Sequence, residues 1–140
     1  VLLDIDDFKS VNDEYGHAAG DGVLSLVARI LSENSKTSDH VCRLGGEEFG
    51  VLLPRCEEIA ARSVAEGYRH HIESARLSHG RHEISVTVSC GVAQAIPSTS
   101  QSDLLERADA ALYAAKTRGR NQTCTDGNLE EEQQEATVVK

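Results

Sequence analysis

A Gly-Gly turn between two short apolar runs constrains the fold of this chain more than any other feature of its sequence. The runs Val41–Leu44 and Phe49–Leu53 flank Gly45-Gly46-Glu47-Glu48, and two strand-like runs joined in this way are typical of a β-hairpin. Segments with strand and helix periodicity alternate before and after this hairpin. Such an alternation with one hairpin inside it predicts a single mixed sheet with helices packed against it.

The other elements follow from the periodicity of the apolar residues. The apolar run Val1–Ile5 predicts a buried strand, and alternation predicts one long strand over Glu83–Ile96. Phe8–Gly22 is rich in turn formers. Apolar residues at helical spacing predict three helices, from about Gly22 to Asn34, Glu57 to Ala75, and Asp103 to Arg118. The resulting order, β-α-β-β-α-β-α, predicts an α/β (α+β) fold similar to a ferredoxin-like or palm arrangement.

The length and net charge of the chain limit how many domains it can form and which classes of partner it can bind. The 140 residues are enough for one domain with a hydrophobic core. A net charge of −9 argues against non-specific binding to DNA, RNA or an anionic membrane. The polar, glutamate-rich stretch 124–140 is expected to be a disordered acidic tail, which leaves 1–123 as the domain. Because the sequence begins inside a strand, we expect the natural N-terminus to lie upstream.

Acidic side chains gather at the end of the first predicted strand and in the hairpin turn. Asp4 and Asp6 are two residues apart in a strand and therefore share a face. Glu47-Glu48 follows two glycines, which let a bulky substrate approach the backbone. Oxygen ligands of this kind suit Mg²⁺, whereas the cysteines and histidines lack the spacing of a zinc site. With the cations Lys9, Lys116 and Arg120, they form the set that two-metal phosphoryl or nucleotidyl transfer requires.

Each of these features also has a purely structural interpretation. Acid-rich strand ends are often solvated turns, and two glycines followed by two acids often form only a hairpin tip. Asp21 can be a helix N-cap, and Asn12 can be a turn residue. Lys116 and Arg120 can simply complement the C-terminus of a helix. No single feature therefore assigns a function.

The features occur together, however, in an order and spacing that resemble one known family. The matching segments are Asp4-Ile5-Asp6-Asp7-Phe8-Lys9, Asn12-Asp13, Gly16-His17, Gly20-Asp21, Arg43-Leu44-Gly45-Gly46-Glu47-Glu48-Phe49, Ser89-Cys90-Gly91-Val92 and Ala108–Lys116 with Gly119-Arg120-Asn121. They closely resemble the GGDEF family of diguanylate cyclases, over Val1 to about Thr123. The resemblance implies a palm-type, nucleotidyl-cyclase-like fold and an enzyme that condenses two GTP into cyclic di-GMP and two pyrophosphates.

The resemblance also implies a role for each matching residue. Two Mg²⁺ ions per site, or Mn²⁺, would be bound by Asp4, the backbone carbonyl of Ile5, Glu47 and Glu48. Glu47 would also help to deprotonate the attacking 3′-hydroxyl, and Lys9 would stabilise the transition state. Asn12 and Asp21 would hydrogen-bond the guanine edge, whose N1–H and N2–H₂ donors adenine lacks, while His17 would support the loop that carries Asp21. The implied substrate-binding residues are Phe8, Asn12, Asp21, Gly45, Gly46, Lys116 and Arg120.

The family pattern further implies an arrangement and a location. Two domains would face each other, each with one GTP, under the control of an upstream domain in the cytoplasm, and without direct membrane contact by this segment. Two departures stand out, because Glu47 replaces the family's Asp and Lys36-Thr37-Ser38-Asp39 stands where the inhibitory motif has Arg-x-x-Asp. Lysine lacks the planar fork of arginine, so weak product inhibition is expected. A third departure is that the family's Asp-x-Leu-Thr-x-Leu-x-Asn-Arg segment before the first strand is missing.

Two other functions are compatible with the same residues. One is a non-catalytic GTP-binding domain that regulates a neighbouring domain. The other is a different nucleotidyl transferase or cyclase with a palm-like core. Asn12 and Asp21 distinguish this last class, since tight binding or turnover of ATP would contradict their assignment to guanine.

Overall fold

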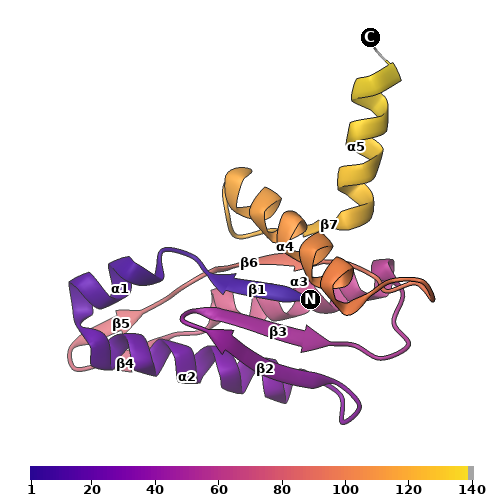
Figure 1. The fold of residues 1–140 in the computed structure, drawn as a ribbon. Coiled ribbons are helices and arrows are strands. Elements are labelled where there is room, and N and C mark those ends of the chain that lie inside the picture. The colour runs from indigo at the N-terminus through magenta and orange to yellow at the C-terminus, as the bar shows by residue number, and fades with distance from the viewer. Residues whose placement is uncertain (139–140) are drawn as a thin grey trace.

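The computed structural model describes residues 1–138 (Figure 1). The strands are β1 (Leu2–Ile5), β2 (His40–Gly45), β3 (Glu48–Leu52), β4 (Leu77–His79), β5 (His82–Ile84), β6 (Val88–Val92) and β7 (Thr123–Thr125). The helices are α1 (Phe8–Tyr15), α2 (His17–Glu33), α3 (Glu58–Ser74), α4 (Gln101–Thr117) and α5 (Asp126–Val138). No helix within residues 1–138 is long and apolar enough to cross a lipid bilayer.

Five strands form the central sheet in the order β2-β3-β1-β6-β7. β1 lies at its centre and pairs antiparallel with both β3 and β6. β2 and β3 form the hairpin expected around Gly45-Gly46, while β7 runs parallel to β6. A small second sheet contains only β4 and β5. The mixed sheet with helices packed against it confirms the expected fold class.

Helices cover the two faces of the central sheet unequally (Figure 1). On one face α2 and α3 enclose the main core, to which β1 contributes Leu3 and Ile5. On the other face α4 packs mainly over β6 and β7, and Leu2 of β1 contacts this helix. The part of this second face formed by β2 and β3 is open, since Leu44 is 52% and Leu52 57% exposed.

A glycine lets α4 approach the sheet closely. At Gly91 of β6, an added Cβ would lie only 2.8 Å from the Cα of Leu112, and it would also clash with the carbonyl oxygen of Ala108. Both neighbours are helix backbone atoms, which cannot move aside as a flexible side chain can. The separation of α4 from β6 therefore depends on the missing side chain at Gly91.

The segment predicted as turns, Phe8–Gly22, is helical. It contains α1 and the first residues of α2, which begins at His17 rather than at Gly22. The glycine at position 20 lies where the two helices meet, because an added Cβ would be 2.9 Å from Cγ of Asn12 and 3.3 Å from Cζ of Phe8. Gly20 thus permits close helix packing and does not break the helix.

The long strand predicted over Glu83–Ile96 is divided into β5 and β6. Alternate residues remain buried through the break, including Val86 at 8% exposure. The backbone changes partner, however, because β5 pairs with β4 and β6 pairs with β1. Between β5 and β6, buried and exposed residues still alternate although the strand pairing is interrupted.

Regular structure also continues past residue 123, into the segment expected to be a disordered tail. Thr123–Thr125 is buried beside β6 as β7. The start of α5 is held by three contacts: Asn128 N–H donates to Thr125 Oγ1 (3.2 Å), Gly127 N–H donates to Glu58 (3.3 Å), and Arg107 pairs with Asp126 (2.8 Å). Beyond this start α5 projects from the sheet and has no buried residue (Figure 1).

Candidate active site

The register of β1 and β3 brings the predicted carboxylates together. Asp4 is the direct partner of Glu48 across the two strands, and the N–H of Ile5 donates to the carbonyl oxygen of Glu47 at 3.2 Å. Asp4, Glu47 and Glu48 are all half-buried. The end of β1 and the start of β3 thus form one acidic centre on the edge of the open part of the sheet.

Lys116 of α4 contacts this centre from above the sheet. Its Nζ lies 3.0 Å from Oδ2 of Asp4, whose side chain is only 14% exposed. Burial raises the pKa of the Asp4 carboxyl, Lys116 opposes that rise, and the charges of Glu47 and Asp6 add to it. Lys116 therefore stabilises the ionised form of Asp4, whereas burial and the neighbouring acids disfavour that form.

Glu48 lies in a similarly unfavourable environment. Burial raises its pKa, and the nearby charges of Asp4 and Asp109 raise it further. Asp109 was not singled out from the sequence, although it precedes Lys116 on α4 by two helical turns and so shares its face. That spacing is the signal that could have identified it. A cation bound here would relieve repulsion among several partly desolvated acids.

The donor set fits a hard divalent cation. Asp4 and Glu48 offer carboxylate oxygens on adjacent strands, and the charge of Glu47 lies near enough to raise the pKa of Asp4. Mg²⁺ uses one or two such carboxylates and completes its shell with water and substrate phosphate. Among the residues that the structure describes, no three His, Cys, Asp or Glu side chains already surround a common point. The arrangement suits an ion that arrives with phosphate ligands.

Asp6, which follows the last residue of β1, has a different environment from Asp4. It is buried, and both of its carboxylate oxygens accept hydrogen bonds. Thr87 Oγ1 donates at 2.7 Å, Ser89 Oγ at 2.6 Å and the backbone N–H of Asn121 at 3.0 Å. The protein itself thus occupies the oxygens of Asp6, which leaves Asp4 as the aspartate of this pair that is available to a metal ion.

The hairpin turn leaves open space beside the acids. Gly45 (φ 153°) and Gly46 (φ 51°) both have positive φ angles, and no atom lies within 4 Å of a Cβ added at either. Arg43 holds the turn by donating from Nε and Nη2 to the carbonyl oxygen of Gly46, at 2.9 and 2.7 Å. A ligand can thus approach the backbone of this turn without displacing a side chain.

The residues expected to contact guanine lie on the helix pair that follows β1. Phe8 and Asn12 of α1 pack against Gly20 of α2. Asp21 is the next residue of α2 and is exposed. His17, expected to support this segment, is the exposed first residue of α2. The structure therefore brings Phe8 and Asn12 together beside the start of α2.

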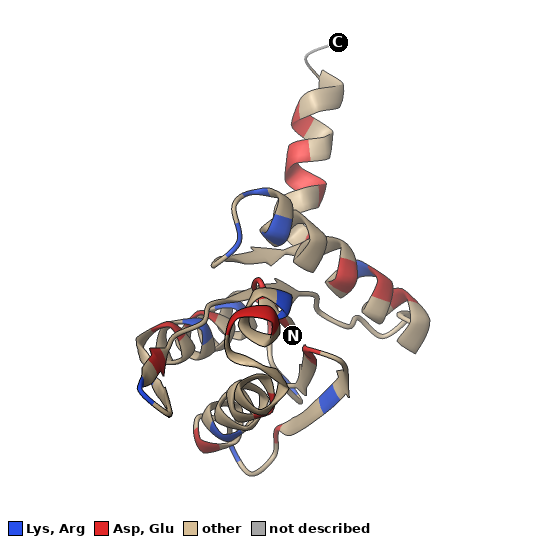
Figure 2. Ribbon diagram, turned by 90° about the vertical axis from the view of Figure 1, so that its left-hand side faces the viewer, with Lys and Arg blue, Asp and Glu red and all other residues tan. Residues whose placement is uncertain are grey.

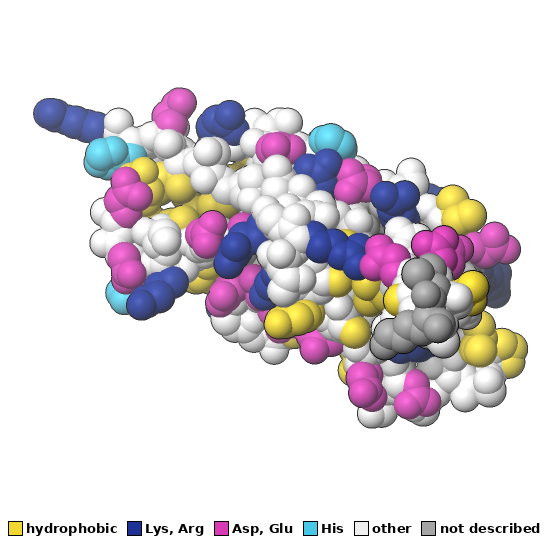
Figure 3. All heavy atoms as spheres, turned by 90° about the horizontal axis from the view of Figure 1, so that it is seen from above, with side chains coloured by type: hydrophobic (Ala, Val, Ile, Leu, Met, Phe, Trp, Pro, Cys, Tyr) yellow, Lys and Arg dark blue, Asp and Glu magenta, His cyan; other side chains and the backbone are white. Residues whose placement is uncertain are grey.

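The remaining predicted cations lie at the ends of helices. Arg120 follows α4, and its Nε is 3.8 Å from Oδ1 of Asp7. Lys9 is exposed in the first turn of α1. Figure 2 shows basic residues at the C-terminal end of α4 and in the loop after it, with acidic residues along α5. Seen from above, acidic and basic side chains are interspersed over the visible face (Figure 3).

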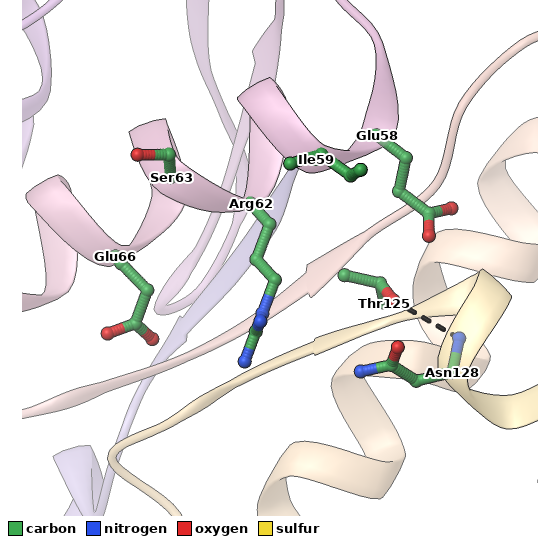
Figure 4. Close-up of a pocket in the computed structure, with 7 residues that line it drawn as sticks. All are labelled: Glu58, Ile59, Arg62, Ser63, Glu66, Thr125 and Asn128. Atoms are coloured by element: carbon green, nitrogen blue, oxygen red, sulfur yellow. Dashed lines mark hydrogen bonds between the residues drawn. The ribbon is translucent and has the colours of Figure 1, made fainter.

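A concave pocket of about 450 Å³ lies elsewhere, between α3 and the start of α5 (Figure 4). It is lined by Glu58, Ile59, Arg62, Ser63, Glu66, Thr125 and Asn128. None of these is a predicted site residue. The candidate site is thus an open surface at the end of β1 and not this pocket.

Known proteins are similar to this chain in both sequence and fold. A family model described as "Diguanylate cyclase, GGDEF domain" matches residues 1–122. Diguanylate cyclase A of Treponema denticola is 43% identical over 131 residues, which cover 92% of this chain and 35% of that relative. The response regulator PleD of Caulobacter vibrioides is 43% identical over 124 residues, 86% of this chain and 27% of PleD. The chain thus spans about a third or less of the length of these relatives.

Among solved structures, the crystal structure of the GGDEF domain of DgcB from Caulobacter crescentus in complex with c-di-GMP gives a TM-score of 0.86 at 36% identity. The match covers 90% of this chain and 75% of that one. The active GGEEF domain of a diguanylate cyclase from Vibrio cholerae gives 0.81 at 31% identity, over 89% of this chain and 79% of that one. The family model and these relatives cover nearly the whole chain, which therefore belongs to the GGDEF domain family of diguanylate cyclases.

Proposed function

We propose that this domain is a diguanylate cyclase that condenses two GTP into cyclic di-GMP and releases two pyrophosphates. The observation that carries the proposal is the pairing of Asp4 with Glu48 beside the open Gly45-Gly46 turn, under the ammonium group of Lys116. This acidic centre has one cation, Lys116, in direct contact. Family membership and the names of the relatives support the same reaction.

The metal centre would be formed by Asp4, the carbonyl of Ile5, Glu47 and Glu48. Two Mg²⁺ ions, or Mn²⁺, would supply Lewis acidity, which lowers the pKa of an attacking hydroxyl and binds the phosphate. The half-buried Glu47 would accept the proton from the 3′-hydroxyl. Its position at the exit of the glycine turn gives a bound nucleotide access to its carboxylate.

The other predicted residues would bind and orient GTP. Lys116, already within 3.0 Å of Asp4, would contact phosphate oxygens bound at the acidic centre, together with Arg120 and Lys9. Asn12 and Asp21 would accept and donate hydrogen bonds at the guanine edge, with Phe8 beside them. Gly45 and Gly46 would let the nucleotide approach the backbone.

Catalysis would require two domains that face each other, since each holds one GTP and each 3′-hydroxyl attacks the other's α-phosphate. Control by an upstream domain in the cytoplasm would act on this association. Feedback by product would be weak at the Lys36–Asp39 segment. There the carboxylate of Asp39 accepts a hydrogen bond from the N–H of Lys36 at 2.7 Å, and no arginine fork is present. Micromolar product inhibition that disappears in Asp39→Ala protein contradicts this expectation.

Product analysis tests the proposal. Concentrated protein is incubated with GTP and Mg²⁺, and the nucleotides are separated for wild type, Glu47→Gln and the matched control Glu33→Gln. Glu33 is an exposed acid at the end of α2. We expect cyclic di-GMP from wild type and from Glu33→Gln, and a loss of at least about 100-fold in Glu47→Gln, the usual scale for a general base.

Two outcomes would favour the alternatives instead. A confirmed dimer that binds GTP and forms no product, in this domain and in a longer protein that contains it, indicates a regulatory GTP-binding domain. Equal turnover of ATP indicates a different nucleotidyl cyclase, because Asn12 and Asp21 would then not select guanine. Product from Glu47→Gln at the wild-type rate contradicts the assigned base.

A further inference from the structure

The loop that carries Arg120 has an unusual backbone. Arg120 (φ 64°) and Asn121 (φ 45°) are consecutive non-glycine residues in the left-handed region. A side chain disfavours this region, and residues that adopt it persist there only when their surroundings hold them. The conformation directs Arg120 outward from the end of α4, where it is exposed and faces Asp7.

Asp6 holds this loop from the sheet. Its Oδ2 accepts the backbone N–H of Asn121 at 3.0 Å, while its Oδ1 accepts the hydroxyl of Ser89 at 2.6 Å. Asp6 is 7% exposed, so its hydrogen bonds are shielded from competition by water. The bond to Asn121 links Asp6, directly after β1, to a residue 115 positions away.

Helix α3 holds the same residue from its other side. Arg69 Nη1 donates to Oδ1 of Asn121 at 2.9 Å, and Nδ2 of Asn121 donates to Glu73 at 2.9 Å. Arg69 is itself only 12% exposed and pairs with Glu66 at 2.8 Å. Asn121 is therefore fixed by its backbone to Asp6, directly after β1, and by its side chain to α3.

We propose that Asp6 is a positioning residue that fixes the left-handed turn at Asn121 and thereby directs Arg120 toward phosphates bound at Asp4. Asp4 lies in β1 and Asp6 directly follows Ile5, the last residue of that strand, so the end of one strand carries both the acidic centre and the anchor of the loop. This inference rests on the proposed function, because the contact of Arg120 with phosphate is part of it. It gives the second aspartate of the Asp-Ile-Asp segment a role that differs from metal binding.

Amide hydrogen exchange tests the anchoring directly and requires no substrate. In Asp6→Ala the backbone N–H of Asn121 loses its partner, so we expect exchange in the 118–122 segment to accelerate at least about tenfold. Ser89→Ala is the matched control, because it removes a hydrogen bond from the other oxygen of the same carboxylate and leaves the bond to Asn121. There we expect less than about a twofold change. If Asp6→Ala does not fold, Asp6→Ser, which keeps a polar group in the buried site, replaces it.

A double-mutant cycle tests the role in substrate binding. The ligand is 3′-deoxy-GTP with Mg²⁺, which lacks the attacking hydroxyl and therefore cannot condense. Arg120→Ala is expected to weaken its binding about tenfold in the wild-type and Ser89→Ala backgrounds, the scale of a charged hydrogen bond. In the Asp6→Ala background, Arg120→Ala is expected to weaken binding of the analogue less than about threefold, because Arg120 is already displaced.

The outcomes separate this inference from the proposed function. If Arg120→Ala weakens binding of the analogue by the same factor in all three backgrounds, the positioning role is overturned, even if the domain makes cyclic di-GMP. Unchanged exchange in Asp6→Ala overturns the anchoring. Failure of the wild type to bind the analogue overturns the proposed function and the phosphate contact with it, while exchange still decides whether Asp6 holds the loop.

Discussion

The fold shifts the pKa values of three carboxyl groups in opposite directions. They belong to Asp4, Glu48 and Glu66. Burial raises the pKa of Asp4 and of Glu48. In contrast, hydrogen bonds from Arg69 hold the pKa of Glu66 below its ordinary value. The first two lie at the candidate site and the third lies in a contact that ties α3 together. The acids of the site thus reduce stability at neutral pH, and the acid of the scaffold adds to it.

Neutralising Glu48 is expected to stabilise the metal-free domain. A raised folded-state pKa means that stability falls as pH rises through the interval between the unfolded and folded pKa values. Above that interval Glu48→Gln should therefore be more stable than wild type, by less than about 1 kcal/mol because the group is partly solvated. Urea unfolding in EDTA at pH 7 measures this, with the exposed Glu106→Gln as control. A lower unfolding free energy for Glu48→Gln than for Glu106→Gln contradicts the expectation.

Glu66→Gln is expected to have the opposite effect. Because the folded pKa of Glu66 is lowered, its stabilisation is present above the unfolded pKa and is lost as pH falls through the folded pKa. We expect the variant to be about 1 kcal/mol less stable at pH 7. The difference from wild type should shrink in acid, as unfolding curves at pH 7 and pH 3 would reveal. A difference that is independent of pH would show that Arg69 does not act through the charge of Glu66.

At the scale of elements, local patterns predicted the β2–β3 hairpin, the three longer helices and the buried strand β1. They did not predict α1, because Asn12, Gly16 and Gly20 are turn formers when read locally. Only the contact of α1 with α2 explains the glycine at position 20. The short strand β7 lies in a polar stretch, and its burial depends on β6 far away in the sequence.

The same distinction applies to the candidate site. Residue chemistry and order identified the acids and cations in advance, and the structure pairs Asp4 with Glu48 and with Lys116. The three hydrogen bonds that occupy Asp6 come from Thr87 just before β6, from Ser89 in β6 and from the loop after α4. No local spacing in the sequence encodes contacts between segments so distant from one another.

Replacing a glycine by alanine at each of two positions tests the packing of α4 on the sheet. Gly91→Ala places a Cβ against the backbone of Ala108 and Leu112, so we expect a loss of at least about 1–3 kcal/mol in unfolding free energy. Gly67→Ala lies inside α3 with nothing within 4 Å of the added Cβ. It should stabilise the domain by about 0.5–1 kcal/mol. Effects of the same sign at both positions would contradict the close approach of α4 to β6.

At the scale of the whole molecule, the body of the domain ends in β7 and the start of α5. Leu129 packs against a small cluster of Ala111, Ala115 and Cys124. Farther along, α5 contributes exposed acids and an ion pair between Glu132 and Arg118 with its side chains 56% and 38% exposed. Exposed pairs of this kind add little to stability.

Truncation after Leu129 is therefore expected to change the unfolding free energy by less than about 0.5 kcal/mol. If the proposed activity holds, it should also leave the yield of cyclic di-GMP unchanged. Truncation after Gln122 removes β7 as well, and we expect it to destabilise the domain strongly because Thr123–Thr125 is buried. Thermal unfolding and product analysis of the two shortened chains measure both effects. A large loss from the shorter deletion would contradict the limited role of α5.

The unequal covering of the central sheet has a consequence for how such a domain can diversify. Its main core lies under α2 and α3, whereas the acidic centre lies at the edge of the open part of the opposite face. Successive residues of a strand point to opposite faces, so a substitution at Asp4 or Glu48 leaves Leu3, Ile5 and Phe49 in place. Changes that alter or abolish the chemistry can therefore accumulate without loss of the folded scaffold. The same architecture can persist in descendants that retain the fold and serve another purpose.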